Sequence, residues 1–428
     1  MDKLDLIIDR YSDKIKRILN RGYLLEEKYL DKVSEILNEV RKFGDKALAE
    51  YTAEFDGYEL GDKFYLTHGD LKRFYDKQDD FSIKSLEYCK DHIEKFHRYQ
   101  LTNSFISREK DGVLLGELIT PIEKVGVYTP GGKASYPTSV IMNVVPAKVA
   151  GVKDIYLATP FVKGKINDIV MAAAYIAGVS RVYSLGGAQA VGAFAYGTES
   201  VPKVDKIVGP GNIFVSLAKK IVFGTVDIDM IAGPTELVII ADENSDPIYV
   251  AADMLAQAEH DELALVLCFT TTERHARLIE EQVNEQLRYI PKLDIAKVAL
   301  NNFGGIIVFD NIEAAFDIAN EIAPEHLELQ INNPLDYISL VRNAGAVFIG
   351  NYSPNAVGDY IAGPNHTLPT TGSARFFSPL GVYDFIKRTS LIKYSREALQ
   401  RDAQHIITLA DHENLQAHKK SIEIRLKK

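Results

Sequence analysis

The amino-acid sequence predicts an α/β protein with mostly parallel sheets, formed by two α/β units that follow one another along the chain. From about Gly112 onward, short runs typical of β-strands alternate with helical runs rich in Ala and Val. This alternation is typical of βαβ units, in which helices cover a parallel sheet. Turns rich in glycine follow three of the predicted strands.

The first α/β unit is expected between residues 125 and 222. Its predicted strands are 125–128, 154–158, 181–185 and 206–208. Its predicted helices are 138–150, 166–177, 188–196 and 212–222. The series predicts one parallel sheet with helices packed on it.

The second α/β unit is expected between residues 237 and 349. Its predicted strands are 237–241, 264–269, 306–309 and 346–349, and its predicted helices are 248–258 and 273–289. The flanking regions are charged and show the helical period at 25–55, 83–99, 396–405 and 413–425. The last two helices carry too few apolar residues for a core of their own, so we expect this tail to pack on the rest of the chain or on a partner subunit.

Length and composition restrict the class of protein. The chain has 428 residues, more than one hydrophobic core usually serves, so two or more domains are expected. Its 46% hydrophobic and 25% charged residues are typical of a soluble globular protein. There are 49 Lys and Arg against 59 Asp and Glu, a net charge of −10 that repels a phosphate backbone, so no nucleic acid partner is expected.

Cysteine usage and hydropathy indicate the compartment. Cys89 and Cys268 are the only cysteines, too few for a disulfide framework, and we interpret both as reduced packing residues. The chain starts without the basic and apolar segments of a signal peptide, and no run reaches the roughly 18 apolar residues of a membrane span. We therefore expect a cytoplasmic protein without a membrane partner.

One candidate metal site lies at the end of a predicted helix, in residues 257–260. If the helix continues, Gln257 and His260 lie three residues apart on one face and can reach the same ion. A helix end whose histidine caps the last carbonyl groups has the same sequence pattern. The spacing alone leaves both interpretations open.

A candidate acid–base pair occurs where a predicted helix gives way to a strand. Glu325 and His326 follow Pro324, and residues 326–331 alternate like a strand with one polar face. A carboxylate and an imidazole can supply two proton-transfer groups of different basicity. An edge strand with polar residues facing solvent would give the same alternation, so this pattern also has two interpretations.

Two further segments carry polar groups of interest. Residues 358–366 contain Asp359 and His366 and are too rich in Gly and Pro for a helix or a central strand. Loops of this kind often deliver polar groups to a site, although an Asx turn explains the composition equally well. Glu413 and His418 fall on a predicted tail helix, where a solvent-facing surface is the default interpretation.

The three glycine-rich turns, at 129–132, 186–189 and 209–212, would let backbone amides approach a phosphate at a helix N-terminus. None has the Gly-x-Gly-x-x-Gly spacing of the dinucleotide fingerprint. The residues alone therefore do not predict NAD. They predict an α/β protein with a candidate His/Asp/Gln metal site, which would suit a hydrolase equally well.

Seven motifs nevertheless occur in an order that resembles the histidinol dehydrogenase family over nearly the whole chain. They are residues 127–132, 186–190, 208–212, 228–236, 257–260, 323–328 and 358–370. The N-terminal hundred residues and the tail resemble the family more loosely, apart from Glu413 and residues 415–419. Asn414 departs from the glycine that is common in the family.

The resemblance implies an aldehyde dehydrogenase-like fold with two incomplete Rossmann-like domains. A first domain of residues 22–127 and 237–380 would carry the metal and the catalytic residues. A second domain, residues 128–236, would be inserted into it and contact NAD. Residues 1–21 and 381–428 would form a helical dimerisation region, with the C-terminal tail packed on the partner subunit.

The resemblance also implies an activity. Similarity to this family implies an NAD-dependent, zinc-containing homodimer with shared active sites and one Zn²⁺ per subunit. Members of the family oxidise L-histidinol through L-histidinal to L-histidine with two NAD, the last steps of histidine biosynthesis. A related dehydrogenase for another amino alcohol, a zinc hydrolase and a regulatory protein that binds metal or nucleotide are the alternatives that the fold and metal ligands leave open.

The family's functional residues carry over by motif. The implied metal ligands are Gln257, His260, Asp359 and His418, the last from across the dimer interface. The implied catalytic residues are Glu325 and His326. The implied substrate contacts are Thr235, Gln257, His260, His326, Asp359, Glu413 and His418. The implied NAD contacts are Tyr128, Gln189 and Asn212. Our hypothesis is that His326 is the base for both hydride transfers and that Glu325 activates the water that adds to the aldehyde.

Overall fold

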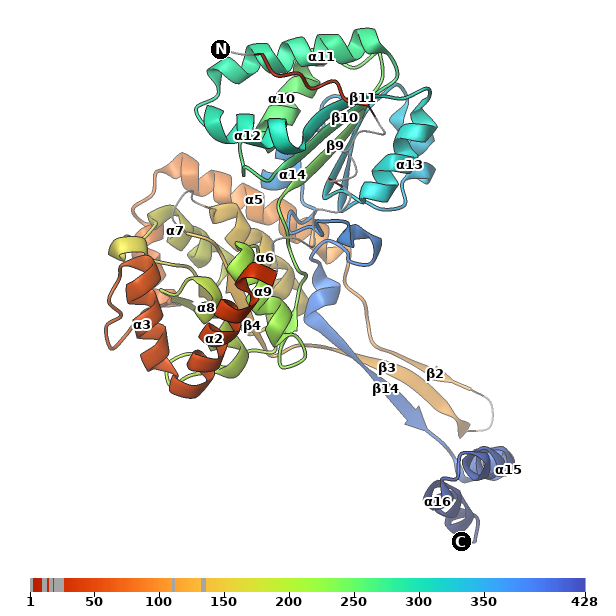
Figure 1. Ribbon diagram of the computed structural model, residues 1–428. Helices are drawn as coiled ribbons and strands as arrows, with labels where there is room; N and C mark the ends of the chain where they lie inside the picture. The colour runs from red at the N-terminus through yellow and green to blue at the C-terminus, as the bar shows by residue number, and fades with distance from the viewer. Residues whose placement is uncertain are drawn as a thin grey trace. The chain divides into compact units, whose positions relative to one another are not determined.

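The computed structural model describes residues 3–9, 14, 18, 27–109, 112–131 and 136–427. Gly132 of one glycine-rich turn and most of the first 26 residues lie outside the described residues. The chain divides into two compact units (Figure 1): Met1–Gln100 with Glu123–Phe385, and Leu101–Ile122 with Ile386–Lys428. The larger unit contains two sheets, each covered by helices.

The first sheet has the strand order β1-β6-β5-β4-β7-β8. Its strands are β1 (Tyr65–Thr67), β4 (Lys124–Tyr128), β5 (Asp154–Ala158), β6 (Arg181–Tyr183), β7 (Lys206–Val208) and β8 (Asp227–Ile228). All neighbours are parallel except β1, which pairs antiparallel with β6. The order reverses beside β4, because the chain moves outward through β5 and β6 and then returns to β7 on the other side of β4.

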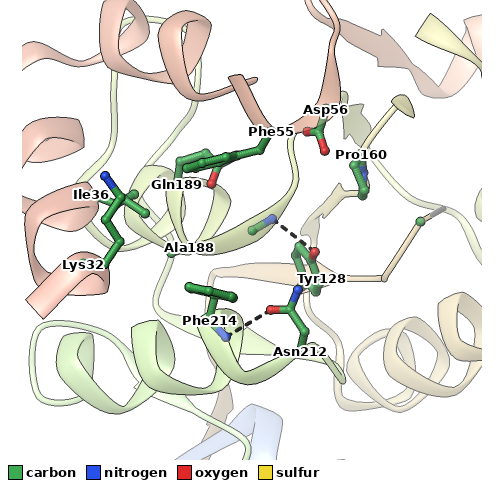
Figure 2. A pocket seen from close by; sticks show the side chains of 12 residues that line it. Lys32, Ile36, Phe55, Asp56, Tyr128, Pro160, Ala188, Gln189, Asn212 and Phe214 are labelled. Atoms are coloured by element: carbon green, nitrogen blue, oxygen red, sulfur yellow. Dashed lines mark hydrogen bonds between the residues drawn. The ribbon is translucent and has the colours of Figure 1, made fainter. Parts of the chain in front are cut away.

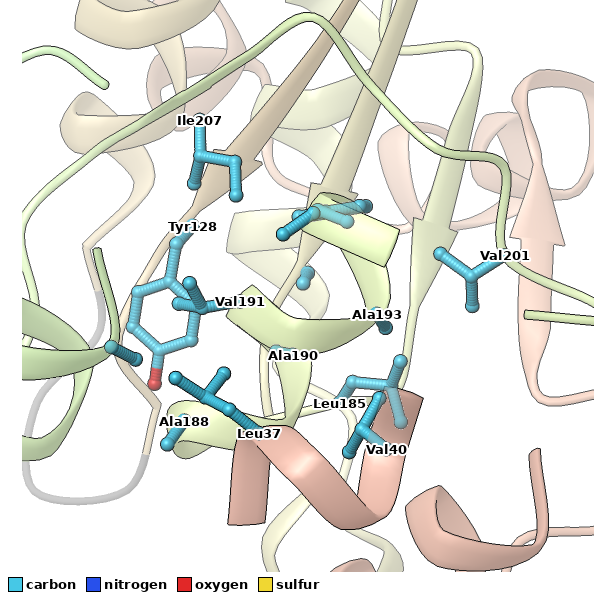
Figure 3. Close-up of a cluster of buried hydrophobic side chains, with 14 of the residues drawn as sticks. Leu37, Val40, Tyr128, Leu185, Ala188, Ala190, Val191, Ala193, Val201 and Ile207 are labelled. Carbon is cyan, nitrogen blue, oxygen red and sulfur yellow. The ribbon is translucent and has the colours of Figure 1, made fainter. Parts of the chain in front are cut away.

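One face of this sheet packs on four helices, α2 (Glu27–Phe43), α3 (Asp45–Asp56), α8 (Gly187–Tyr196) and α9 (Ile213–Val222). Figure 3 shows part of the buried cluster, in which Leu37 and Val40 of α2 pack against α8 and the residues before it. The ring of Tyr128 at the end of β4 belongs to the same cluster. The core therefore fixes the end of β4 against α8.

The other side chains of these strands alternate to the opposite face, as the strand period requires. There α6 (Pro137–Ala150) contacts β4 and β5, and it packs on α5 (Asp80–Arg98) and α7 (Asp168–Ala177). α4 (His68–Tyr75) packs on α7 and begins with a capping box between Thr67 and Asp70.

The second sheet has the order β11-β10-β9-β12-β13 and is parallel throughout. Its strands are β9 (Glu236–Ala241), β10 (Leu265–Thr270), β11 (Gly304–Val308), β12 (His326–Gln330) and β13 (Ala346–Ile349). One face packs on α10 (Pro247–Ala258), α11 (Glu273–Gln286) and α12 (Leu293–Phe303). The other face packs on α13 (Ile312–Ile322). β9 and β12 are buried at every position, as is typical of parallel strands covered on both faces.

Short elements complete the larger unit. They are α14 (Asn355–Tyr360) and the 3₁₀ helices Val162–Gly164, Leu287–Tyr289, Pro334–Leu340, Ser373–Arg375 and Val382–Phe385.

The smaller unit combines an antiparallel sheet with two helices. Its strands are β2 (Phe105–Arg108), β3 (Leu114–Pro121) and β14 (Ile386–Lys393), in the order β14-β3-β2. Its helices are α15 (Arg396–His412) and α16 (Gln416–Leu426). No residue of α16 is buried within the chain. Asn414, between the two helices, has a φ of 58°, a left-handed conformation that glycine adopts freely and asparagine tolerates better than most residues.

Most predicted elements of the two α/β units are confirmed within a few residues. The predicted tail helices 396–405 and 413–425 correspond to α15 and α16, but the region 381–428, expected to be helical, also contains β14, which pairs with β3 over eight residues. Its polar side chains are mostly exposed, so the strand lacks the apolar run that would have revealed it. Cys89 and Cys268 are free and buried. Among the described residues, no helix is long and apolar enough to cross a membrane.

Candidate active site

The candidate site lies where β9 and β12 begin. The two strands are adjacent and parallel, with His326 paired to Leu237, so the residues that precede both strands share one edge of the sheet. α10 runs back from the end of β9, and its last turn therefore returns to this edge with Gln257. Residues 90 positions apart in sequence thus become neighbours.

Glu325 is buried and held by two donors from the neighbouring strand. Its Oε2 accepts hydrogen bonds from the Thr235 hydroxyl at 2.7 Å and from the backbone N–H of Glu236 at 3.0 Å. Burial raises the pKa of the Glu325 carboxyl, while nearby His326 and the two hydrogen bonds oppose that rise. A carboxyl with a raised pKa is a stronger base once it is ionised, as a group that activates water must be.

His326 presents one ring nitrogen to the strand and leaves the other free to act. Its Nδ1 lies 2.9 Å from the Glu236 carbonyl oxygen; a carbonyl only accepts, so Nδ1 carries the proton. Nε2 then holds the lone pair and lies 3.9 Å from Asp359 Oδ1. The imidazole is thereby oriented as a base by the backbone of β9. The second interpretation of the sequence, an edge strand with solvated polar residues, is wrong, because β12 lies between β9 and β13 and is buried.

Gln257 is fully buried and connects the pair to a second layer of polar groups. Its amide nitrogen donates to the Thr235 hydroxyl, and its Oε1 accepts from Asn355 Nδ2 at 2.6 Å. A continuous chain of hydrogen bonds therefore runs from Asn355 through Gln257 and Thr235 to Glu325. The amide oxygen of Gln257 keeps a second lone pair for another ligand.

His260 lies beyond the end of the helix. α10 ends at Ala258, so the expectation of two ligands on one continuous helical face is only partly met. The His260 side chain still interacts electrostatically with Asp359 and His326, and desolvation lowers its pKa although the residue reaches the surface. The neutral imidazole, the form that binds a metal, is favoured.

Asp359 was expected in a loop, but it lies in the last turn of α14. The helix is only six residues long and ends where the Gly- and Pro-rich segment begins, which is why composition hid it. Asp359 is partly exposed, and its carbonyl oxygen accepts from His366 Nδ1 at 2.9 Å. His366, to which the sequence assigned no role, is packed inside the site with its Nε2 3.2 Å from the Ser139 hydroxyl.

A cavity of about 400 Å³ opens beside these groups. His326, Asp359 and His366 line it together with apolar residues that include Phe348 and Leu368. Apolar walls with a few convergent polar groups are typical of a small-molecule site. The cavity gives the free Nε2 of His326 access to a substrate.

Of the four expected metal ligands, the larger unit contributes Gln257, His260 and Asp359, whereas His418 belongs to the smaller unit. Glu413 also belongs to the smaller unit, and both residues are exposed. Within the described part of the chain, no group of three or more His, Cys, Asp or Glu side chains is arranged to hold a metal ion.

A second pocket, of about 430 Å³, lies over the first sheet. The three expected NAD contacts, Tyr128, Gln189 and Asn212, all line it (Figure 2). The Tyr128 hydroxyl accepts from the Gly187 N–H at 3.2 Å, and Asn212 caps α9 by accepting from the amides of Phe214 and Val215. Gln189 is buried, and neither atom of its side-chain amide has a hydrogen-bond partner among the residues that the structure describes.

A buried ion pair shapes the turn that carries Asn212. Lys219 and Asp229 are paired and fully buried, and they hold Gly209 from both sides: the Lys219 ammonium donates to its carbonyl at 3.0 Å, and Asp229 accepts from its N–H at 2.7 Å. Gly209 has a φ of 114° and lies against the backbone of Tyr128, so a side chain there would be both strained and obstructed. This pair was not predicted, because Lys219 lies in a largely apolar helical run and Asp229, although within the motif 228–236, is ten residues further along the chain.

Two buried carboxyl groups form another feature that the sequence did not reveal. Glu328 of β12 and Asp253 of α10 are joined by a shared hydrogen bond and by the Gln330 amide, which lies 3.0 Å and 2.8 Å from them. Burial raises the pKa of Glu328 to about 8 and that of Asp253 to about 6. Glu328 also accepts from the N–H of Asn355 at 2.8 Å, so this pair fixes the start of α14.

Replacing Glu328 with Gln tests the protonation of this pair. Between pH 4.5, the ordinary pKa of the carboxyl, and about pH 8, the native wild type retains the Glu328 proton, whereas the unfolded chain has lost it. The native state binds more protons in this range, so its stability falls as the pH rises. Glu328→Gln should flatten that fall, because a neutral amide can still donate to Asp253.

The measurement is the denaturant midpoint of wild type and Glu328→Gln from pH 5 to pH 8, in steps of about half a unit. Glu313→Gln, on the surface of α13, is the matched control and should keep the wild-type slope. Equal slopes for wild type and Glu328→Gln would show that Glu328 is not protonated in the native state.

The chain is similar to known proteins over nearly its whole length. A family model described as histidinol dehydrogenase matches residues 19–426. The histidinol dehydrogenase of Aquifex aeolicus is 50% identical over 417 residues, which cover 97% of each chain. That of Listeria monocytogenes is 50% identical over 387 residues, 90% of each chain.

Solved structures give the same result. The crystal structure of histidinol dehydrogenase from Elizabethkingia anophelis superposes with a TM-score of 0.92 at 37% identity, covering 99% of this chain and 98% of that one. An NAD-dependent aldehyde dehydrogenase from Sinorhizobium meliloti has a TM-score of 0.50 at 13% identity, covering 85% and 87% of the two chains, a likeness of fold alone. The chain belongs to the histidinol dehydrogenase family of NAD-dependent oxidoreductases.

Proposed function

We propose that Glu325 and His326 perform the proton transfers in the oxidation of L-histidinol through L-histidinal to L-histidine. One observation carries the proposal: both side chains are buried at the edge of the second sheet, oriented by the backbone of β9. Bound NAD supplies the hydride acceptor for each of the two oxidations. The remaining chemistry is the removal of protons and the addition of one water.

In the first oxidation, His326 Nε2 accepts the hydroxyl proton of the alcohol as the hydride leaves. This role fits its free lone pair and its place on the cavity wall. Glu325 then takes a proton from the water that adds to the aldehyde carbon. Once its first proton has passed to solvent, His326 removes the remaining hydroxyl proton of the hydrate anion as the second hydride leaves, and the carboxylate of the product forms. Two bases thus serve three proton removals.

We further propose that Gln257, His260, Asp359 and the partner subunit's His418 would hold one Zn²⁺. An amide oxygen, a carboxylate and two neutral imidazoles suit zinc. The three ligands from the larger unit have the chemistry that this requires. The lowered pKa of His260 favours its neutral form, and Gln257 Oε1 retains a lone pair. The ion would orient the imidazole and amine of the substrate, with Thr235 and Glu413 as further contacts.

The same proposal covers the architecture. The two sheets would be two incomplete Rossmann-like domains; the domain of the first sheet would include α2, α3, β1 and β4 together with residues 128–236, rather than leaving residues 22–127 with 237–380 as expected, because these elements pair or pack with that sheet. Tyr128, Gln189 and Asn212 would contact NAD in the second pocket, where the N-terminus of α8, which has no side-chain cap, would face its phosphates. Residues 1–21 and 381–428 would form the dimer contacts of a cytoplasmic homodimer, and the absence of buried residues in α16 supports this role for the tail.

The division of labour between the two bases predicts different kinetic effects. His326→Asn should slow the oxidation of both histidinol and supplied histidinal by roughly 10²–10⁴-fold, because one base serves both steps. Glu325→Gln should slow mainly the oxidation of histidinal, because only that step needs water. Stopped-flow absorbance of NADH with each substrate measures the two steps separately.

Glu321→Gln, on the surface of α13, is the control for Glu325→Gln and should leave both steps unchanged. Metal content is measured in every variant. An equally severe loss of histidinol oxidation in Glu325→Gln, with zinc still bound, would contradict the assignment of water activation to Glu325.

A shared site predicts complementation between subunits. His260→Ala and His418→Ala homodimers should both bind zinc weakly. Mixed dimers contain one site with both substitutions and one with neither, so they should recover one working site per dimer. Tagged subunits are mixed, purified as heterodimers and assayed for zinc and activity; confirmed heterodimers without recovery would show that the site is not shared.

A zinc hydrolase and a dehydrogenase for another amino alcohol are distinguished by one assay. Histidinol and NAD should give a rise in absorbance at 340 nm that a chelator suppresses, whereas a hydrolase would give none. The initial rate with histidinol should exceed the rate with other amino alcohols, including sulfonate-bearing ones. A faster rate with one of those alcohols would mean that it, and not histidinol, is the substrate.

A further inference from the structure

Asp56 occupies an unusual place in the pocket over the first sheet. It is the last residue of α3 and lines that pocket. Figure 2 shows its carboxylate beside Pro160, on the side of the pocket away from Lys32. Oδ2 also lies close to Gly186, at the turn that starts α8. The acidic group is thus placed among the elements that would surround a bound dinucleotide.

The environment of Asp56 is unfavourable in the absence of a ligand. Its Oδ2 is shielded from solvent and has no hydrogen-bond partner among the described residues. The helix dipole at the C-terminus of α3 also disfavours a negative charge. Burial raises the pKa of Asp56 to about 6, so the carboxylate still prevails at neutral pH. A buried acceptor without a donor costs stability, and hydroxyl groups of a ligand would supply the missing donors.

The rest of the pocket indicates which part of a dinucleotide meets Asp56. Pro160 follows β5, the strand that comes next along the chain after β4 and lies beside it. In dinucleotide sites at a reversal of strand order, an acidic residue at the end of this next strand binds the ribose of the adenosine half. Asp56 comes from α3, yet it places its carboxylate at the same position. Ile36, Phe55 and Phe214 add apolar surface for the base.

We propose that Asp56 accepts hydrogen bonds from the ribose hydroxyls of the adenosine half of NAD and makes the enzyme select NAD over NADP. The proposal rests on the assignment of this pocket to NAD made above. A 2′-phosphate on the ribose carries roughly two negative charges, which would be repelled by the Asp56 carboxylate. The described lining has no arginine, and its one cation, Lys32, lies on the side of the pocket away from Asp56.

Asp56→Asn is the decisive substitution, because it retains the shape and one acceptor but removes the charge. Loss of charge-assisted bonds should raise the KM for NAD roughly 10- to 100-fold. The kcat should change less than about twofold, because Asp56 does not touch the reacting atoms. The preference for NAD over NADP in kcat/KM should fall at least about tenfold, since the repulsion is removed.

Direct binding provides a readout independent of turnover. Calorimetry with ADP-ribose and with its 2′-phosphorylated form should show weaker binding of the first to Asp56→Asn and stronger binding of the second, relative to wild type. Glu54→Gln, an exposed carboxylate on the same helix, is the matched control and should leave both affinities unchanged. Asp56→Asn removes an unpaired buried charge, so its thermal unfolding midpoint should not fall below that of the wild type.

Asn212→Ala separates this proposal from the assignment of the pocket. An increase in the KM for NAD in Asn212→Ala, with wild-type affinities in Asp56→Asn, would overturn the role of Asp56 and leave the pocket assigned to NAD. Unchanged NAD affinity in both variants would overturn both. A drop in the unfolding midpoint of Asp56→Asn would show that the carboxylate serves the fold, and it would equally contradict the proposal.

Discussion

The parallel pairing of β9 with β12 is the constraint on which the site depends. Because both strands start at the same edge, the residues just before them meet: Thr235 and the backbone of Glu236 hold the Glu325 carboxylate, and the Glu236 carbonyl orients His326. Both Glu325 and His326 are therefore hydrogen-bonded to residues at the start of one strand. A shift of one residue in this register would turn every one of these side chains to the opposite face.

This arrangement explains why the surrounding polar network is so extensive. Burying two ionisable groups at a sheet edge costs free energy unless each polar atom finds a partner. The partners follow one another through hydrogen bonds. Glu325 bonds to Thr235, Thr235 to Gln257 and Gln257 to Asn355, which in turn bonds to Glu328 of the buried pair with Asp253. The network therefore couples the edge that carries Glu325 and His326 to α10 and α14, which bear the proposed metal ligands Gln257 and Asp359. The hydrogen bonds that hold the site also satisfy most of the polar atoms buried behind it, with Gln330 Oε1 and Asn355 Oδ1 as exceptions among the described residues.

The sequence predicted what local periodicity controls. Strands such as 154–158 and helices such as 188–196 are confirmed because their apolar patterns match the faces that they bury. β14 and α14 were missed because an exposed strand and a six-residue helix lack such patterns. Glu325 and His326 stood out in sequence, but their partners Thr235 and Glu236 are 90 residues away. Asp56 and the pair of Lys219 and Asp229 acquire meaning only from their surroundings, so no spacing rule could have found them.

The most direct measurement is a crystal structure of the zinc-loaded enzyme with L-histidinol. We expect the alcohol oxygen to lie within hydrogen-bond distance of His326 Nε2, roughly 2.6–3.2 Å, with Nδ1 still bonded to the Glu236 carbonyl. We also expect Glu325 to face the substrate carbon that later accepts water. A substrate whose alcohol points away from His326, or a His326 ring that has turned its Nδ1 from β9, would contradict this mechanism.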